Sequence, residues 1–478
     1  MRLVILGDCE TIGVLQSPIY MYVKGMVWSM GSKDAGCLWN GSRRVFGLAA
    51  CCIVICMLFC FTGCHAEETQ TGTNDNQGSM ADGVLDISGE DIQSGSGEEI
   101  QNISGDDNQG SSAEEVPNIS EDDIQDFPTG AWEMAEHMGI GINLGNTMEA
   151  YWEDTADLTG GTQTIGDDTP VCYETCWGAV ETTEEMIDSM KEAGFSTLRI
   201  PVYWGNMMMD DGTFTINQEY LGRVEELVTY GLDAGMYVVI NIHHYDQFLI
   251  EHYPQDQVLD ITEGLWKQIA EYFRDYPEEL IFEGFNEALG MIGPEGQLSE
   301  ERMYAFVNHM NQTFVDTVRS TGGANAARIL IVSGYNTNID ATTDERFRMP
   351  EDVVEDRLMV SVHYIDNACY WTNSVGNEAW IEYSRSQCEL LKARFLDQGI
   401  PVFVGECTAI YPSERISWDA EVTQSSDCLE AILGMIAQYG MVPVLWDTCD
   451  QFYLRSGQRI ASKEDQAVIE AYNHMEDR

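Results

Sequence analysis

Two glutamates each follow a run of apolar, β-prone residues, and together they could break a glycosidic bond. Glu287 ends the segment Glu283-Gly284-Phe285-Asn286-Glu287, and Glu406 lies in Gly405-Glu406-Cys407. Glycosidic hydrolysis needs one carboxyl group that stays protonated, to donate to the leaving oxygen, and a second that stays ionised, to attack or to activate water. A lone glutamate at a strand end is more often a partner in a structural ion pair. The hypothesis of a catalytic pair therefore depends on the elements and residues around these two.

Short apolar runs alternate with helix-period segments from about residue 131 onwards. Most runs are continuously apolar, which is typical of parallel strands covered on both faces. Eight such strands with helices between them predict an α/β fold, a closed (β/α)8 TIM barrel. The predicted strands are Gly139–Leu144, Thr197–Val202, Tyr237–Ile242, Leu280–Phe285, Arg328–Val332, Leu358–Val362, Pro401–Gly405 and Val442–Trp446. The predicted helices include Glu184–Ala193, Glu219–Ala234, Gly264–Tyr276, Glu300–Thr321, Glu378–Gln398 and Leu429–Tyr439.

Polar and aromatic residues lie at the carboxyl-terminal edges of the predicted strands, where barrels of this kind place their working residues. Any one of them could have a purely structural role, as a core histidine or a packed tryptophan does. Because they come from the same end of separate strands, an active site is the simpler interpretation. They are Asn146, Arg199, His243, His244, Asn286, Glu287, His363, Glu406 and Trp446.

Six segments, in this order, resemble the serial motifs of glycoside hydrolase family 5 across roughly residues 127–478. They are Gly141 to Thr147, Leu198 to Val202, Asn241 to His244, Phe282 to Glu287, Ser361 to Tyr364, and Val404 to Glu406. The family is built on a (β/α)8 barrel, with its acid/base and nucleophile at the ends of the fourth and seventh strands. Our count of strands places Glu287 and Glu406 there. The resemblance implies a retaining endo-β-1,4-glucanase that uses no cofactor and no metal ion.

The resemblance also implies a role for each matching residue. Glu406 would attack the anomeric carbon, while Glu287 would protonate the leaving oxygen and later take a proton from water, with the carboxyl groups about 5 to 5.5 Å apart. Arg199 would hydrogen-bond Glu406 and keep it ionised, and Asn286 would bind the 2-hydroxyl of the sugar. The remaining matches are cleft-lining or sugar-contacting residues, namely Asn146, His243, His244, His363, Tyr364 and Trp446.

Aromatic residues in the predicted loops are candidates for neighbouring sugar subsites, because sugar rings present apolar faces. These are Tyr151, Trp152, Trp177, Trp204 and Trp371. Trp266 and Trp380 lie inside helical patterns, which favours a place in the core.

The chain departs from the family pattern at three positions. Ala288 follows the acid/base candidate where the family usually has Pro, and Asp447 follows Trp446 where a second Trp is common. Two residues after His363, where a family tyrosine usually hydrogen-bonds the nucleophile, the chain has Ile365. Neighbouring strand residues point to opposite faces, so Tyr364 could replace that hydroxyl only across a bulge. We therefore expect the pKa of the nucleophile to be less depressed than in relatives that carry the tyrosine.

The net charge of the chain limits which polymers it can bind. The formal net charge is −56, and such a field repels phosphate backbones and polyanionic polysaccharides. A neutral β-glucan is therefore a better partner than nucleic acid. We also expect a monomer.

The first 127 residues predict export and tethering rather than a folded domain. Arg43 and Arg44 precede the apolar stretch Val45–Phe61, which ends in Thr62-Gly63-Cys64 and resembles a bacterial lipoprotein signal with Cys64 as the acylated residue. An uncleaved membrane helix is the alternative. Residues 65–127 are acidic and of low complexity, with an imperfect repeat, and predict a flexible linker. We therefore expect three segments, 1–64, 65–127 and the catalytic domain 128–478, on the outer face of a bacterial membrane or in the medium.

Three other functions remain open at this stage. Related β-glycanases acting on mixed-linkage glucan, xyloglucan or mannan share the fold and the catalytic pair, since loops choose the polymer. A non-catalytic glycan-binding lipoprotein is a second alternative, favoured only by Ile365. A metalloenzyme using His243, His244 and Asp246 is a third, although no further ligand set accompanies them. The seven cysteines after residue 128 are an odd number, which argues against a dense disulfide framework.

Overall fold

In this computed structural model the described residues are 14–15, 20–21, 129–152, 169–209, 211–288, 292–293, 296–370, 375–410 and 426–476. The chain divides into two units, residues 1–107 and 108–478. Within the first unit, β1 (Val14–Leu15) and β2 (Tyr20–Met21) form an antiparallel pair. The apolar stretch with Cys64, the acidic segment 65–127 and Trp371 lie outside the described residues.

The second unit contains a closed barrel of eight parallel strands, which confirms the predicted fold. Its order around the barrel follows the sequence, and all eight predicted strands are present. They are β3 (Gly141–Asn143), β4 (Thr197–Ile200), β5 (Tyr237–Asn241), β6 (Leu280–Glu283), β9 (Leu330–Ser333), β10 (Leu358–His363), β11 (Val402–Thr408) and β12 (Val442–Trp446). Two short antiparallel pairs, β7 (Ile292–Gly293) with β8 (Gly296–Gln297) and β13 (Tyr453–Leu454) with β14 (Arg459–Ile460), lie in connections outside the barrel.

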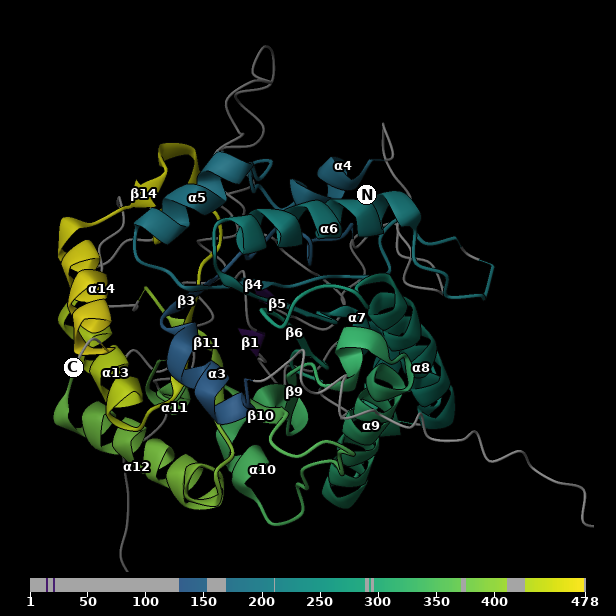
Figure 1. Ribbon diagram of the computed structural model, residues 1–478. Coiled ribbons are helices and arrows are strands. Elements are labelled where there is room, and N and C mark those ends of the chain that lie inside the picture. Colours follow the sequence, from purple (N-terminus) through teal and green to yellow (C-terminus); the bar gives the residue numbers. More distant parts are fainter. Residues whose placement is uncertain are drawn as a thin grey trace, which may run out of the picture. The chain divides into compact units, whose positions relative to one another are not determined.

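Helices surround the strands, while α3 lies across the barrel rather than beside it (Figure 1). None of the helices in the described residues combines the length and the apolar character needed to cross a bilayer. The helices are α3 (Ala131–Met138), α4 (Pro170–Glu174), α5 (Glu184–Glu192), α6 (Gln218–Asp233), α7 (Tyr245–His252), α8 (Gln255–Tyr272), α9 (Glu300–Ser320), α10 (Ile339–Thr343), α11 (Asn367–Tyr370), α12 (Glu378–Arg394), α13 (Ser426–Gln438) and α14 (Lys463–Glu476).

The barrel interior is apolar at one end and polar at the other. Alternation along each strand sends every second side chain inward, so β10 places Met359, Ser361 and His363 inside. Met359 belongs to an apolar cluster with Met134 and Met138 of α3, which therefore closes the amino-terminal end of the barrel. The next layer is polar and buried, and contains Asn143, Arg199, Asn241, Glu283 and Ser361. Working groups thus meet only at the carboxyl ends of the strands, as the fold predicts.

A β-bulge in β11 turns Glu406 toward the interior. Val404 pairs with Pro443 and Cys407 with Leu445, so two residues of β11 lie opposite one residue of β12. The extra residue breaks the alternation, because a regular strand would send Glu406 outward. Gly405 suits this position: a Cβ there would lie 3.0 Å from the Ser361 hydroxyl and 3.3 Å from a carboxylate oxygen of Glu283.

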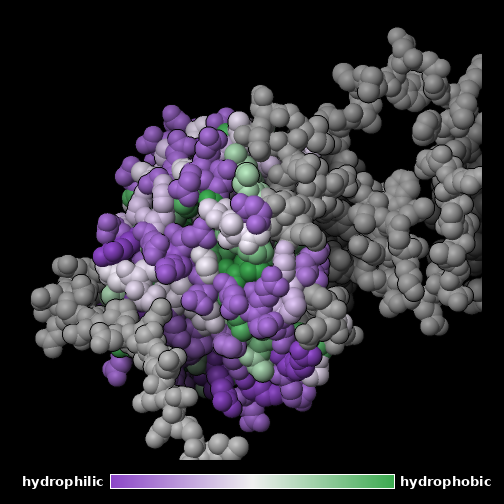
Figure 2. All heavy atoms as spheres, turned by 90° about the vertical axis from the view of Figure 1, so that its right-hand side faces the viewer, coloured by the Kyte–Doolittle hydropathy of each residue, from purple (hydrophilic) through white to green (hydrophobic). Residues whose placement is uncertain are grey.

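The outer surface reflects the acidic composition. Seen from the side on which α8 and α9 lie, it is mostly hydrophilic, with hydrophobic groups confined to a narrow central band (Figure 2). This pattern is typical of a barrel that buries most of its apolar area between strands and helices.

Candidate active site

Glu287 and Glu406 meet at the carboxyl end of the barrel, with His363 between them. The His363 Nδ1 lies 2.9 Å from an oxygen of Glu287 and 3.7 Å from an oxygen of Glu406. One oxygen of each carboxylate and a nitrogen of His363 all lie within 4.8 Å of one another. Carboxyl groups this close match the spacing used for double displacement, whereas inverting enzymes separate theirs by about 6.5 Å or more.

Arg199 holds the polar layer together beneath this pair. Its guanidinium is fully buried and contacts two carboxylates, donating from Nε to Glu283 at 2.7 Å and from Nη1 to Glu406 at 3.2 Å. The same group donates to the amide oxygens of Asn143 and Asn286, both at 2.9 Å. Its contact with the Asn286 oxygen leaves the amide nitrogen of Asn286 to donate elsewhere. A bidentate, always charged group of this kind suits a site that must keep a carboxylate ionised.

Glu283 is a site residue whose role the sequence did not predict. It is 1% exposed, and its carboxylate accepts hydrogen bonds from Arg199, from Asn241 Nδ2 at 2.9 Å and from the Ser361 hydroxyl at 2.9 Å. The spacing of two residues between Ile281 and Glu283 could have identified it, because this spacing puts both side chains on the inward face of β6. An acid on the inner face of an otherwise apolar strand requires a buried cation, and Arg199 supplies it.

Comparison with known proteins decides the family. Residues 164–451 match the profile described as Cellulase (glycosyl hydrolase family 5). The chain belongs to glycoside hydrolase family 5. Endoglucanase 1 of Ruminococcus albus is 34% identical over 326 residues, which cover 67% of this chain and 73% of that protein. A xyloglucan-specific endo-β-1,4-glucanase of Bacteroides ovatus is 33% identical over 344 residues, covering 66% of this chain and 64% of its own.

Solved structures of the family have the same barrel. A broad-specificity endoglucanase from Ruminococcus champanellensis with bound cellotriose superposes with a TM-score of 0.61 at 29% identity, covering 71% of this chain and 98% of that one. A lichenase from Caldicellulosiruptor sp. F32 gives a TM-score of 0.62 at 28% identity, covering 72% of this chain and 95% of that one. The family 5 assignment therefore rests on both sequence and fold, and the chain is a glycoside hydrolase.

Tyr364 supplies the hydroxyl that the sequence placed in doubt for this family 5 enzyme. Its Oη donates to Glu406 Oε2 at 2.9 Å. The strand ends at His363, the pairing with β11 shifts there, and Tyr364 has a φ of 46°. The strict alternation that would turn Tyr364 outward therefore no longer applies. The irregularity that this replacement requires is therefore present, and Ile365 is buried in the core. The expectation that the pKa of Glu406 is less depressed than in relatives stays a prediction.

We expect Tyr364→Phe to move the acidic limb of the pH–activity profile to higher pH. The hydroxyl stabilises the ionised form of Glu406, so its loss raises the pKa of that carboxyl. A hydrogen bond to a charged group contributes about 1.5 to 3 kcal/mol, so kcat should fall by roughly ten- to a hundredfold. Profiles of kcat/KM for Tyr364→Phe and for Ile365→Val, which leaves the hydroxyl in place, test this. An unshifted acidic limb in Tyr364→Phe would contradict it.

Burial sets the protonation of the catalytic pair. Desolvation raises the pKa of Glu287 to about 7, against the lowering effect of Arg199. Desolvation also raises the pKa of Glu406, but His363, Arg199 and the Tyr364 hydroxyl oppose that rise. Glu287 has fewer groups that favour its ionised form, so we assign it the proton that the two carboxyls share near neutrality.

The three histidines of the cleft are neutral. Burial lowers the pKa of His244 and of His363 to about 4 and lowers that of His243 well below its ordinary value. Around the catalytic pair the Arg199 guanidinium therefore supplies the cationic charge. In the described part of the chain, His243, His244 and Asp246 do not form a group within ligating distance of one another. The metalloenzyme hypothesis thus has no support from their arrangement.

We expect Arg199→Met to destabilise the fold more than most single substitutions. It would leave Glu283 and Glu406 as buried carboxylates without their cation, a loss of about 3 to 5 kcal/mol. Denaturant unfolding of the variant at pH 7 measures it. Arg346→Met is a matched control, because Arg346 also bridges two carboxylates, Asp344 and Glu300, but with about a third of its side chain exposed. An equal loss of the free energy of unfolding in the two variants would contradict the conclusion that burial makes Arg199 more important for stability than Arg346.

Aromatic rings lie beside His243 and His244. The Trp446 ring is parallel to His243, with centroids 5.9 Å apart. Tyr151 stacks on Tyr203 at 4.5 Å, and Trp177 lies 5.3 Å from Tyr151 and 5.8 Å from His244. Tyr151, Trp177 and Trp446 are partly exposed. Two of the predicted loop candidates, Tyr151 and Trp177, thus lie beside His244, and their role in sugar subsites stays a prediction.

The predicted sugar contact of Trp204 is wrong. The sequence placed it among the sugar-contacting residues, but it is fully buried, and its indole N–H donates to the Asn241 carbonyl at 2.8 Å. It packs inside the wall, because the backbone carbonyl of Asn241 at the end of β5 offers that N–H a buried partner. Trp266 and Trp380 are buried in the core, as predicted. Asn146 is half-buried at the turn after β3, where it has a φ of 60° and its backbone N–H donates to the Glu149 carboxylate.

Proposed function

We propose that this family 5 hydrolase is a retaining endo-β-1,4-glucanase, with Glu406 as nucleophile and Glu287 as acid/base. The observation that carries the proposal is the separation of the two carboxylates, within 4.8 Å, on either side of His363. In the first step Glu406 attacks the anomeric carbon, and Glu287 gives its proton to the leaving oxygen. In the second step Glu287 takes a proton from water, which attacks the same carbon and releases Glu406.

The surrounding residues fit these steps. Arg199 and Tyr364 stabilise the negative charge of Glu406 before attack and after its release. The amide nitrogen of Asn286, whose oxygen is held by Arg199, is the donor for the 2-hydroxyl of the sugar, a contact that strengthens in the transition state. His363, neutral and beside both carboxylates, orients Glu287. Trp446 offers its face to the sugar at the cleavage point.

The substrate is a neutral β-glucan, with cellulose-like chains as the first choice and mixed-linkage glucan and xyloglucan as the nearest alternatives. Support comes from relatives whose names include an endoglucanase, a xyloglucan-specific enzyme and a lichenase. The acidic composition, with a net charge of −56, disfavours anionic polymers.

A substrate panel tests this function. The full chain is incubated with carboxymethyl cellulose, barley β-glucan, xyloglucan and galactomannan, and new reducing ends are measured. We expect the highest rates on the β-1,4-glucans and mixed-linkage glucan, and a rate about a thousandfold lower with Glu287→Gln. A preference for galactomannan would overturn the substrate class, and a parent-like rate in the Glu287→Gln variant would overturn the catalytic assignment.

We also propose that the enzyme acts as a monomer outside a bacterial cell, held at the membrane through acylated Cys64 or released. The support is the basic pair before an apolar stretch, the Phe61-Thr62-Gly63-Cys64 segment and the acidic linker that follows. Metabolic labelling with a radioactive fatty acid, compared with a Cys64→Ala chain, tests the lipid anchor. Equal labelling of the two chains would exclude it.

A further inference from the structure

Trp132 is exposed at the end of the barrel opposite the catalytic pair. Among the tryptophans in the described residues, only Trp132 is exposed, at 37%. It lies on α3, whose Met134 and Met138 point into the barrel. Its indole N–H donates to the Glu136 carboxylate at 3.1 Å, one turn along the helix. The ring is thus held in place on the outer face, at the cost of leaving apolar area in water.

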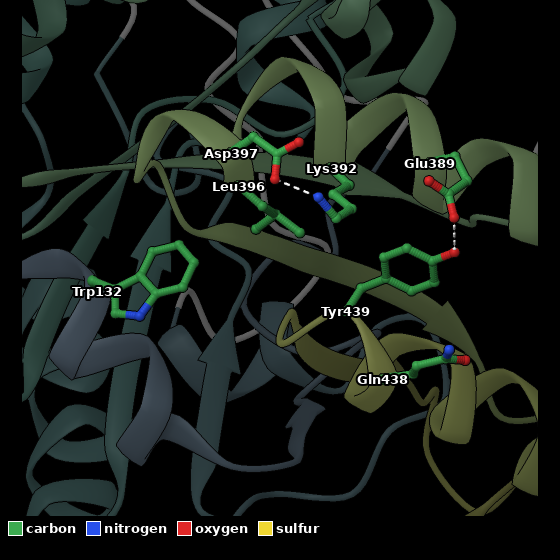
Figure 3. Close-up of a pocket in the computed structure, with 7 residues that line it drawn as sticks. All are labelled: Trp132, Glu389, Lys392, Leu396, Asp397, Gln438 and Tyr439. Carbon is green, nitrogen blue, oxygen red and sulfur yellow. Dashed lines mark hydrogen bonds and ion pairs between the residues drawn. The ribbon is translucent and has the colours of Figure 1, made fainter.

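Two hollows lie on either side of Trp132 and share it as a wall. The first, of about 390 Å³, lies between α3, α12 and α13. Figure 3 shows Trp132 and Tyr439 reaching this space from opposite sides, with Leu396 between them and Lys392 and Gln438 nearby. The second, of about 580 Å³, is lined on its far side by Met349 and by the segment from Asp352 to Leu358. The turn at residues 396–400 borders both hollows. We name the two together the Trp132 groove.

The residues that line the Trp132 groove favour one chemical class of ligand. Each hollow has the volume of a small-ligand site. Trp132 and Tyr439 provide flat apolar rings, and Gln438 and the charged side chains provide hydrogen-bonding groups around them. Acids outnumber bases in the lining, because Glu389, Asp397, Asp352, Glu355 and Asp356 face only Lys392 and Arg357. An anionic ligand, including the chain's own acidic segment, is therefore disfavoured. A neutral polyhydroxylated ring fits both the aromatic and the polar groups.

The groove is separate from the catalytic site. Leu358 begins β10 and lines the groove, whereas His363 ends the same strand beside the catalytic carboxylates. A strand of six residues spans about 20 Å. A glucan segment in the groove would therefore be distinct from the one being cut, either on another chain of an insoluble substrate or further along the same chain.

We propose that the Trp132 groove is a second binding site for β-glucan, which keeps the enzyme on insoluble substrate. The inference rests on the proposed function, because it takes the ligand class from the reaction. Binding at a second site raises the effective concentration of substrate at the catalytic site without changing the chemical step.

Retention on insoluble glucan tests the groove. The full chain with Glu287→Gln is mixed with acid-swollen cellulose, and the bound fraction is measured with and without Trp132→Ala. We expect Trp132→Ala to weaken binding about tenfold, the usual scale for removing a central aromatic anchor. Tyr272→Ala is the matched control, because Tyr272 is equally exposed at 37% and lines neither hollow. Equal retention of the Trp132→Ala and Tyr272→Ala chains would overturn the proposal and point to a different occupant.

Two further measurements keep the result unambiguous. In the active chain, Trp132→Ala should lower the rate on swollen cellulose and leave kcat/KM on soluble cellotetraose unchanged, so a loss on both substrates would count against the proposal.

Tyr439→Ala, on the other wall, should weaken retention in the same way, and it replaces Trp132→Ala in the test if that variant does not fold. Failure of the parent chain to cut any glucan would remove the proposed function itself, whereas normal cutting with unchanged retention would remove only the second site.

Discussion

Replacing Glu406 by Gly is expected to lower turnover of β-glucan by roughly four orders of magnitude or more. The substitution removes the atom that attacks the anomeric carbon, while Glu287 and Asn286 stay in place. Initial rates of reducing-end release on carboxymethyl cellulose measure the loss. The backbone at this position is already next to a glycine, so the bulge should tolerate a second one.

Azide distinguishes a lost nucleophile from a damaged fold. Added to Glu406→Gly with an aryl β-cellobioside, azide can occupy the space of the carboxylate and attack the anomeric carbon as the phenolate leaves. We expect recovery of phenol release and a glycosyl azide of α configuration, because one displacement inverts the centre. A β-configured azide product would instead assign the nucleophile to another residue.

Replacing Glu287 by Gln is expected to lower turnover of β-glucan by about three orders of magnitude, the usual range for general acid–base catalysis. Glutamine keeps the size of the side chain but cannot give a proton to the leaving oxygen. The alkaline limb of the parent profile should also disappear. Since burial raises the pKa of Glu287 to about 7, and the protonated form is the active one, parent activity should decline as the pH rises through about 7.

The leaving group provides the control for this variant. A dinitrophenyl leaving group departs without a proton, so the first step in Glu287→Gln should stay fast with a dinitrophenyl β-cellobioside. The second step still needs a base, and we therefore expect a burst of dinitrophenolate followed by slow turnover. If the Glu287→Gln substitution slowed the first step by the same factor on the dinitrophenyl and polymeric substrates, a proton-donating role would be contradicted. Glu271→Gln, which changes an exposed acid on the outer helix α8, should leave both rates unchanged.

The barrel and its catalytic pair could be predicted because their signals are local. Continuous apolar runs mark strands buried on two faces, and a polar residue directly after each run lies at the shared carboxyl end of the barrel. Glu287 follows this rule, whereas Arg199 lies within β4, one residue before its end. Glu406 was also predicted at this end, but its inward direction depends on the bulge at Gly405, which an apolar run does not reveal.

The remaining residues depended on backbone details that the sequence does not show directly. Tyr364 reaches Glu406 because its φ is positive, a conformation that is uncommon for residues other than glycine. A tryptophan after a strand can either face the ligand or pack into the wall of the barrel, and the local sequence does not distinguish the two. Trp204 packs into the wall because its indole N–H binds the carbonyl of Asn241, which is distant in the sequence. The role of Glu283 could not be predicted, because the four residues of β6 are too few to make the alternation of their side chains evident.

The bulge in β11 gives the barrel two consecutive inward positions, Gly405 and Glu406, opposite the single residue Val444 of β12. Deleting Gly405 would allow β11 and β12 to pair evenly, yet it would move the Glu406 side chain to the place of Gly405, where a Cβ would lie 3.3 Å from a carboxylate oxygen of Glu283. Two buried carboxylates would then meet deeper in the barrel, away from Glu287. A redesign that made this strand regular is therefore expected to lose the reaction.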